Sequence, residues 1–297
     1  MKLLLNYLRK NKLKKFLIIE EDKLTDTLDI FNLKGKKAVI TGGSGILGSA
    51  IARGLGKAGA EVAICDIINT NKIVNEFKEE RIKVKGYYID VMDIEKIKTC
   101  YNKIMNDFER IDILINAAGG NVKEATTSEE LSFFDLPLSA FEKVVGLNLF
   151  GGSILPCQVF GRSMVKNEEG GTIINISSMS AFRPLTKTAG YSAAKAAVSN
   201  FTQWLANHFA QEYNRKLRVN AIAPGFLLTQ QNRYLLLDKD GNFTPRAKAI
   251  IAHTPIGEFG KPEDLIGACV WLASNASRFV TGVVVPIDGG FNAYSGV

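Results

Sequence analysis

Histidine and cysteine are scarce in this chain of 297 residues, which contains two histidines and four cysteines. The cysteines, Cys65, Cys100, Cys157 and Cys269, are scattered, and none forms a Cys-x-x-Cys pair. Because zinc sites draw on clustered cysteines and histidines, we expect no metal site. Each cysteine lies in an apolar run, as small buried thiols do, which favours a reducing, cytoplasmic setting.

The sequence also lacks a stretch of about 18 uncharged apolar residues, so we expect no integral membrane segment. The formal net charge is +7, but residues 1–20 carry six Lys/Arg against one Glu. The remaining residues have 31 basic and 29 acidic side chains. The body of the protein is therefore nearly neutral, and we expect no nucleic-acid partner.

The first 30 residues interleave leucines with lysines, in apolar runs too short for a secretory signal. Three interpretations stay open: an amphipathic extension without fixed structure, a helix that binds a membrane surface or a partner, and a wrongly assigned start codon. We treat residues 1–30 as a basic amphipathic extension and residues 31–297 as one domain.

From residue 36 onward, segments of strand character alternate with segments of helix character, and runs such as Ile113-Leu114-Ile115 are typical of strands covered on both faces. Strands are expected at 37–41, 61–65, 83–89, 112–117, 171–177, 216–222 and 282–287. Helices are expected at 46–58, 71–80, 93–108, 139–166, 190–213 and 262–274, with a helical excursion within 228–252. This order predicts an α/β fold with a doubly wound, parallel, seven-stranded sheet whose binding crevice lies at the carboxyl ends of the strands.

A glycine-rich turn joins the strand at 37–41 to the helix at 46–58. Within it, Gly43, Gly45 and Gly48 have the spacing G-x-G-x-x-G. Glycines at this spacing let the backbone approach a pyrophosphate, which lies at the positive end of the helix dipole. Taken alone the turn is weak evidence, but in a strand–turn–helix context it indicates a dinucleotide site.

Small and polar residues follow the next three strands. Asp66 ends the second strand, 18 residues after Gly48, where a carboxylate binds the hydroxyls of an adenosine ribose and repels a 2′-phosphate. This position favours NAD(H) over NADP(H). Asp90-Val91 ends the third strand, and Asn116-Ala117-Ala118-Gly119 ends the fourth, where small side chains leave room for a flat ring.

Tyr191 and Lys195 are four residues apart on a predicted helix, so they share one face. A free tyrosine has a pKa near 10, too high for efficient acid–base work near neutrality, and a nearby ammonium lowers it. Ser178, at the end of the fifth strand, could hold a substrate oxygen against the tyrosine. Considered without the other motifs, the two residues could instead be a half-buried tyrosine and a solvated lysine with no catalytic role.

Two further elements complete the predicted crevice. Asn148 lies in the helix at 139–166, whose glycines weaken regular helix, and a kink there would suit a proton relay from Lys195 to solvent. Pro224-Gly225 ends the sixth strand, and Thr229 could bond a nicotinamide carboxamide. The expected cofactor contacts are Gly42, Ser44, Gly45, Ile46, Leu47, Gly48, Asp66, Asp90, Val91, Asn116, Ala117, Ala118, Gly119, Tyr191, Lys195, Pro224, Gly225 and Thr229.

The segment from Gln230 to Pro255 is long for a loop, and such excursions beside a crevice are often lids or substrate loops. Guanidinium groups bind carboxylates in a bidentate manner, so Arg233 and Arg183 are candidates to receive an acidic substrate.

These motifs, with Thr281-Gly282 and Asp288-Gly289-Gly290, resemble the short-chain dehydrogenase/reductase family in its single-domain branch, from about Phe31 to Val297. The resemblance implies a Rossmann fold, an NAD-dependent oxidoreductase acting on CH–OH groups, and a homotetramer packed through the helices at 139–166 and 190–213 and the last strand. It also implies a catalytic tetrad of Asn148, Ser178, Tyr191 and Lys195.

Within that family, segments 180–185, 232–236 and 251–255 are similar to D-mannonate oxidoreductase (fructuronate reductase) members. This similarity implies the interconversion of D-fructuronate and D-mannonate. Gluconate 5-dehydrogenases and 2-dehydro-3-deoxy-gluconate 5-dehydrogenases remain close alternatives.

Ile46 stands where the single-domain branch usually has glycine, and the spacing around it also fits the nucleotide-sugar epimerase branch. That branch needs a separate substrate domain, for which the 73 residues after Pro224 are too few. An NAD-binding protein without turnover is a further distant alternative.

Overall fold

The computed structural model describes residues 28–229 and 233–296. The predicted extension at 1–30 therefore lies almost wholly outside the described residues, as does the start of the predicted substrate loop at 230–232. At the beginning of the described chain, a short 3-10 turn, η2 (Asp29–Phe31), leads into the domain.

Seven parallel strands form one sheet in the order β3-β2-β1-β4-β5-β6-β7. The strands are β1 (Lys37–Thr41), β2 (Glu61–Asp66), β3 (Val84–Tyr88), β4 (Ile113–Asn116), β5 (Gly171–Ile176), β6 (Leu217–Pro224) and β7 (Val284–Ile287). The order reverses between β1 and β4, so a crevice opens at the carboxyl ends of these two strands. The predicted fold class is confirmed, and strand ends differ from the expected ones by at most two residues.

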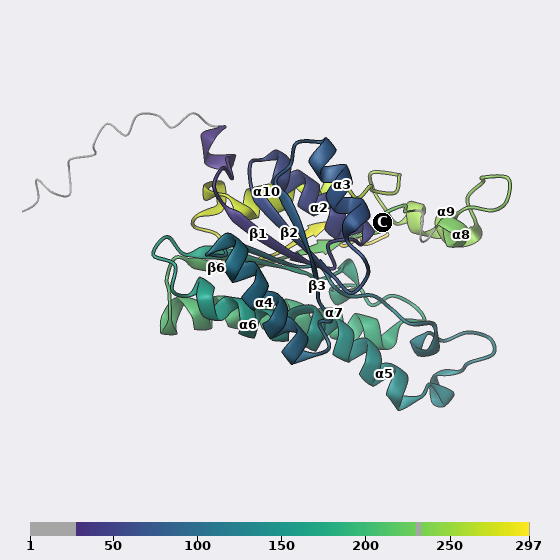
Figure 1. The fold of residues 1–297 in the computed structure, drawn as a ribbon. Helices are drawn as coiled ribbons and strands as arrows, with labels where there is room; N and C mark the ends of the chain where they lie inside the picture. Colours follow the sequence, from purple (N-terminus) through teal and green to yellow (C-terminus); the bar gives the residue numbers. More distant parts are fainter. Residues whose placement is uncertain (1–27, 230–232, 297) are drawn as a thin grey trace, which may run out of the picture.

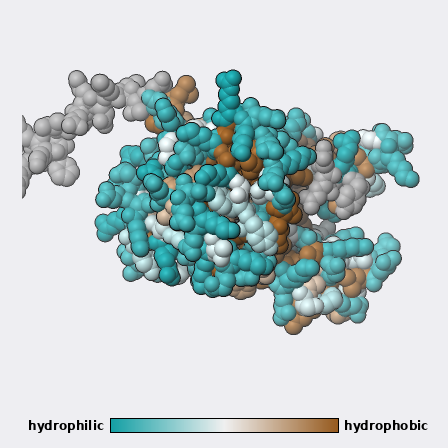
Figure 2. Space-filling view, viewed as in Figure 1, coloured by the Kyte–Doolittle hydropathy of each residue, from teal (hydrophilic) through white to brown (hydrophobic). Residues whose placement is uncertain are grey.

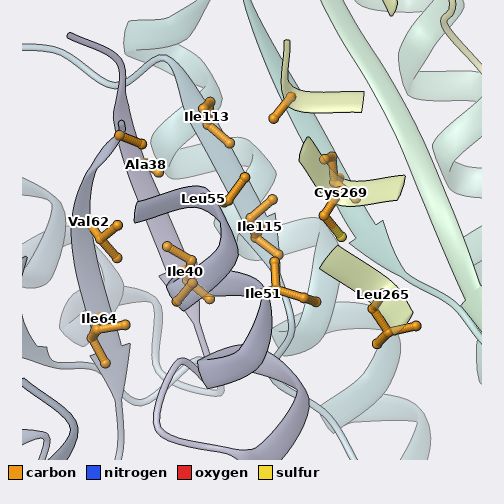
Figure 3. Close-up of a cluster of buried hydrophobic side chains, with 14 of the residues drawn as sticks. Ala38, Ile40, Ile51, Leu55, Val62, Ile64, Ile113, Ile115, Leu265 and Cys269 are labelled. Carbon is orange, nitrogen blue, oxygen red and sulfur yellow. The ribbon is translucent and has the colours of Figure 1, made fainter. Parts of the chain in front are cut away.

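Helices cover both faces of the sheet (Figure 1). One layer contains α2 (Ile46–Lys57), α3 (Asn71–Glu79) and α10 (Asp264–Ala273), and the other contains α4 (Ile94–Phe108), α6 (Leu155–Met164) and α7 (Ala189–Glu212). A separate hydrophobic cluster fills the space between the sheet and each layer. In the first cluster, side chains of α2 and α10 meet those of β1, β2 and β4, with Ile40, Ile51 and Leu55 fully buried (Figure 3).

The predicted helix at 139–166 is interrupted in the structure. It consists of α5 (Leu138–Val145), a π-helical stretch η5 (Gly146–Ile154) and α6, so the expected weakening by glycines takes the form of wider turns. Glycines have low helix propensity, and π-helical insertions often occur at functional sites.

The same span, Leu138–Met164, is long and apolar enough by composition to cross a membrane. However, 56% of its most apolar window is buried inside the fold, and both its η5 and α6 parts contribute core residues. The span is therefore packed in the manner of a core helix.

Two lobes project from the same side of the molecule (Figure 1). One carries α8 (Arg233–Leu236) and α9 (Pro245–Ala252). Their residues Leu236, Ala247 and Ile250 form a small buried cluster with Phe259, which follows α9 in the chain. The other carries the 3-10 turns η3 (Lys123–Ala125) and η4 (Phe133–Asp135) and leads into α5. Apolar side chains gather on this side of the molecule, near the lobes (Figure 2).

Candidate active site

A cleft of about 360 Å³ lies where β1, β4, β5 and β6 end. It brings together the glycine turn, the end of β4, the end of β5, the start of α7 and the segment after β6. Its lining residues are Gly42, Gly45, Ile46, Leu47, Gly48, Ala117, Gly119, Gly120, Ile176, Ser177, Ser178, Tyr191, Lys195, Pro224, Gly225, Phe226, Leu227 and Thr229.

The glycine turn is packed too closely to admit side chains. Gly42 has φ of 64°, and a Cβ placed there would lie 2.8 Å from the backbone of Ala118. A Cβ at Gly48 would lie 2.2 Å from the carbonyl oxygen of Gly42. The turn therefore presents bare backbone to the cleft, with Gly45 as the N-cap residue of α2.

Asp66 ends β2 beside this turn but does not line the cleft. Its side chain is buried (9% exposed), and Oδ2 accepts a hydrogen bond from the Ser44 N–H at 2.9 Å. Its other oxygen accepts from the Ile68 N–H at 3.3 Å. The carboxylate therefore fixes the glycine turn relative to β2, a contact that the sequence did not predict.

The ends of β3 and β4 differ in their contacts. Asp90 accepts from the Met92 N–H at 3.0 Å and pairs with Lys96 at 3.6 Å, so it and Val91 form a turn outside the cleft lining.

Asn116, at the end of β4, is buried and donates to Asn175 Oδ1 at 2.8 Å, which ties β4 to β5. Asn116 and Ala118 therefore lie behind the lining, whereas Ala117 and Gly119 face it.

Asn148 is buried in η5 and holds the segment after β4. Its amide nitrogen donates to the carbonyl oxygens of Gly120 at 2.6 Å and Val144 at 2.8 Å, and its oxygen accepts from the Gly120 N–H at 3.1 Å. A Cβ built on Gly119 would lie 2.8 Å from Asn148 Oδ1 and 3.5 Å from Lys195 Nζ. The structure thus brings Asn148 and Lys195 to the same glycine.

Tyr191, Ser178 and Lys195 meet in the cleft, as the sequence predicted. Ser178 hydrogen bonds the tyrosine hydroxyl, and its own oxygen accepts from the Ser180 N–H at 3.1 Å. Lys195 Nζ donates to the carbonyl oxygen of Ile176 at 2.7 Å and lies 5.6 Å from the centre of the tyrosine ring.

The electrostatics of this group differ from the sequence expectation. Burial raises the pKa of Tyr191, and the hydrogen bond from Ser178 lowers it by less. Burial also lowers the pKa of Lys195 to about 8, because a buried ammonium loses its hydration. The expected lowering of the tyrosine pKa by Lys195 is therefore not seen, since the lysine amine is directed at a backbone carbonyl.

The turn after β6 is held by the end of β7. The Gly225 N–H donates to the Ile287 carbonyl oxygen at 2.9 Å, and a Cβ at Gly225 would lie 2.5 Å from the backbone of Asp288. This packing directs Pro224, Gly225 and Thr229 into the cleft lining.

Neither predicted substrate cation lines the cleft. Arg183 is exposed and donates from Nε and Nη2 to the carbonyl oxygen of Asn292, at 3.3 and 3.2 Å. Arg233 is exposed at the start of α8. The structure therefore gives Arg183 a partner within the chain, near the C-terminal end.

The lining also includes residues that the sequence did not single out, namely Gly120, Ile176, Ser177, Phe226 and Leu227. Each lies next to, or within two residues of, a predicted site residue. Adjacency to a strand end was the available signal, because every lining segment follows a strand of the sheet or begins a helix.

The cleft fits a dinucleotide. The glycine turn presents bare backbone to the cleft, and the Ser44 hydroxyl is buried with no hydrogen-bond partner among the described residues. A phosphate oxygen would supply that partner at the N-terminus of α2, where the helix dipole favours negative charge. In the described part of the chain, no group of three or more histidine, cysteine or acidic side chains could hold a metal ion.

Comparison with known proteins agrees with this geometry. Residues 42–292 match a family model described as enoyl-(acyl carrier protein) reductase. The chain belongs to the short-chain dehydrogenase/reductase family. As a member, it is an NAD(P)-dependent oxidoreductase that acts on CH–OH groups.

Among solved structures, this chain is similar to a protein from Haemophilus influenza that carries the provisional name D-mannonate oxidoreductase and has bound NAD. The two are 47% identical, with a TM-score of 0.83 over 90% of this chain and 98% of the other. A gluconate 5-dehydrogenase from Burkholderia cenocepacia, in complex with NADP and tartrate, is 29% identical with a TM-score of 0.78 over 90% and 98% of the chains. A 2-dehydro-3-deoxy-D-gluconate 5-dehydrogenase from Dickeya dadantii is 34% identical over 90% of this chain and 99% of its own.

Proposed function

We propose that this protein is an NAD(H)-dependent oxidoreductase that interconverts D-fructuronate and D-mannonate. The observation that carries the proposal is that Ser178, Tyr191 and Lys195 line the same cleft as the glycine turn. The choice of a sugar acid is supported by the names of the similar proteins, and the choice of D-mannonate by the provisional name of the 47% identical structure.

The cofactor contacts proposed are those on and behind the cleft wall. The glycine turn and Ser44 would hold the pyrophosphate, Asp66 the adenosine ribose, and Asp90 and Val91 the adenine. Asn116, Ala117, Ala118 and Gly119 would support the nicotinamide half, with Pro224, Gly225 and Thr229 at the carboxamide. Bound NADH supplies the hydride that a ketone carbon accepts. A buried carboxylate at Asp66 disfavours a 2′-phosphate, which supports NAD(H) over NADP(H).

In the proposed mechanism, Tyr191 donates a proton to the ketone oxygen, and Ser178 holds that oxygen through its hydroxyl. The Ser180 N–H fixes the Ser178 oxygen, so the serine proton is free to point toward the tyrosine and the substrate. Lys195, with a pKa near 8, can change protonation near neutral pH. Asn148 holds the Gly119-Gly120 backbone next to Lys195, which places it to support proton return from solvent.

A second candidate is a gluconate 5-dehydrogenase or 2-dehydro-3-deoxy-gluconate 5-dehydrogenase activity at the same site. The 34% identical relative over nearly its full length favours it. The chemistry is the same transfer of a hydride to a ketone, and only the sugar acid differs.

We also propose a cytoplasmic homotetramer. Its support is the exposed aromatic surface of η5 and α7, where Phe150 and Trp204 are each at least half exposed. Trp204 stacks between Phe201 and His208, with centroid distances of 6.2 and 4.7 Å, so this face is preorganised for contact. Sedimentation analysis of the purified chain would give the mass of the assembly, and a monomer at all concentrations would contradict it.

Asp66→Ala is expected to reduce the preference for NADH over NADPH by roughly tenfold, because charge-assisted hydrogen bonds contribute about 1.5–3 kcal/mol. The measurement is the ratio of kcat/KM for the two cofactors. Asp66→Asn separates the lost charge from the lost contact with Ser44, and Asp240→Ala on the surface is the control. An unchanged ratio in both variants at position 66 would place the ribose contact elsewhere.

Arg233→Leu is expected to raise KM for a uronate more than KM for a neutral ketose, since only the uronate has a carboxylate to pair. A several-fold difference between the two increases is expected from the loss of one exposed ion pair. Arg246→Leu, an exposed arginine in the same lobe, is the matched control. Equal increases for both substrates would remove the carboxylate role from Arg233.

The experiment that tests the function is a panel of substrates with the purified protein and NADH, followed by absorbance. The panel contains D-fructuronate, 5-keto-gluconate, 2-dehydro-3-deoxy-gluconate ketones and neutral ketoses. The highest kcat/KM is expected for D-fructuronate. A higher kcat/KM for a keto-gluconate would favour the second candidate function. Oxidation of NADH with neutral ketoses only would contradict both candidate functions.

A further inference from the structure

We infer that Ser177 is a positioning residue that ties the helical turn carrying Lys195 to the end of β5. Its side chain is buried next to Ser178 and has no role in the chemistry proposed above. Its hydroxyl oxygen lies 3.1 Å from the carbonyl oxygen of Lys195 and 2.7 Å from Ser199 Oγ. The inference rests on the proposed function only in the role given to Lys195.

The backbone of Ser177 is fixed on the sheet, because its N–H donates to the Ile222 carbonyl oxygen in β6 at 2.8 Å. One residue earlier, the Ile176 carbonyl oxygen accepts from Lys195 Nζ at 2.7 Å. Lys195 is therefore held to the end of β5 at both its main chain and its amine. Two attachment points define the direction of the side chain, whereas one would leave it free to pivot.

The number of hydroxyl protons shows that Ser177 makes the hydrogen bond that connects the end of β5 to α7. Ser177 and Ser199 each have one hydroxyl proton. Three oxygen–oxygen distances within hydrogen-bond range connect the two hydroxyls to each other and each of them to the Lys195 carbonyl. Either Ser177 donates directly to that carbonyl, or it donates to Ser199, which then donates to the carbonyl at 3.2 Å. Without Ser199 the direct bond remains, but without Ser177 only a bond within α7 remains.

The same face of β5 makes a second attachment farther along the helix. Asn175, two residues before Ser177 and hence on the same side of the strand, donates to Thr202 Oγ1 at 2.9 Å. Thr202 is seven residues after Lys195 and so lies on the same face of α7. The contacts of Ser177 and Asn175 thus form a row of hydrogen bonds between β5 and α7, and the Ser177 contact is the one nearer to the active site.

The test compares Ser177→Ala with Ser199→Ala. In Ser177→Ala we expect kcat for ketone reduction to fall roughly tenfold or more, because small misplacements of catalytic groups are costly. The Tm should change little, because the Lys195 carbonyl keeps Ser199 as a donor. The Kd for NADH should change little, because the glycine turn and Asp66 are untouched. Ser199→Ala should retain kcat, since the direct bond from the strand persists.

A readout independent of turnover is the protonation of Lys195, followed by NMR of 13C-lysine-labelled protein and identified by its absence in Lys195→Arg. Tyr191 is the titratable group that faces Lys195 in the described contacts. In Ser177→Ala the midpoint should rise from near 8, because the loosened turn admits water to the amine.

If Ser177→Ala and Ser199→Ala have the same kcat and the same midpoint for the titration of Lys195, the inference is overturned. Equal losses of kcat in both variants, each with a lower Tm, would also overturn it by showing a merely structural role. If wild-type protein reduces no ketone in the panel, the proposed function fails, and the NMR comparison still decides the inference.

Discussion

Tyr191→Phe is expected to reduce kcat by about a thousandfold, since general acid catalysis contributes roughly 10²- to 10⁴-fold. The phenylalanine ring keeps the packing of the tyrosine but has no proton to donate. Ser178 and Lys195 remain, and neither replaces an acid directed at the ketone oxygen. Binding of NADH, measured by fluorescence quenching, should change by less than about threefold, because the glycine turn and Asp66 are untouched.

The control is Tyr213→Phe, which removes the same hydroxyl from an exposed tyrosine at the far end of α7. It should turn over like the wild type. Persistent turnover of Tyr191→Phe would remove the tyrosine mechanism, and a joint loss of turnover and NADH binding would show that the residue mainly supports the cofactor site.

Gly48→Ala is expected to weaken NADH binding by about 10- to 100-fold. The added Cβ would lie 2.2 Å from the Gly42 carbonyl oxygen and 3.1 Å from Gly43 Cα, so only backbone could move. Overpacking of this kind costs about 1–3 kcal/mol, and the displaced turn is the one that would hold the pyrophosphate. Isothermal titration with NADH measures the effect.

Gly267→Ala is the matched control, because a Cβ there meets nothing within 4 Å on the exposed face of α10. It should bind NADH normally and gain up to about 1 kcal/mol of stability from the better helix propensity of alanine. Wild-type affinity in Gly48→Ala would show that the turn does not contact the cofactor closely.

The strand positions and the crevice could be predicted because they depend on local patterns. Continuous apolar runs mark buried parallel strands, and the residues that follow such strands must converge at one edge of the sheet. Ser178, Tyr191 and Lys195 followed in the same way, from one strand end and one helical spacing, whereas the tetrad with Asn148 came from the resemblance to the family. Ser178, Tyr191 and Lys195 meet in the cleft for this reason.

The remaining features depend on contacts between distant parts of the chain. The π-helical stretch around Asn148 is stabilised by bonds to Gly120, 28 residues away. Arg183 reaches a carbonyl 109 residues away, which no local pattern indicates. The pKa of Tyr191 follows from burial and from where the Lys195 amine points, and neither can be obtained from a spacing of four residues.

Asp66 combines both kinds of information. Its place at the end of β2 predicted a carboxylate in the adenosine part of the crevice. Its hydrogen bond to the Ser44 N–H shows that it also braces the glycine turn, so the two predicted elements form one unit. This is why Asp66→Asn is a necessary companion to Asp66→Ala.

The most direct test of the proposed function is the stoichiometry of product formation from D-fructuronate and NADH by the wild-type protein. The products would be identified by chromatography and NMR. The proposed reaction predicts one D-mannonate and one NAD⁺ for each D-fructuronate consumed. Conversion of a sugar without net oxidation of NADH, as in an epimerase, or binding of NADH with no product from any ketonic sugar acid, would contradict it.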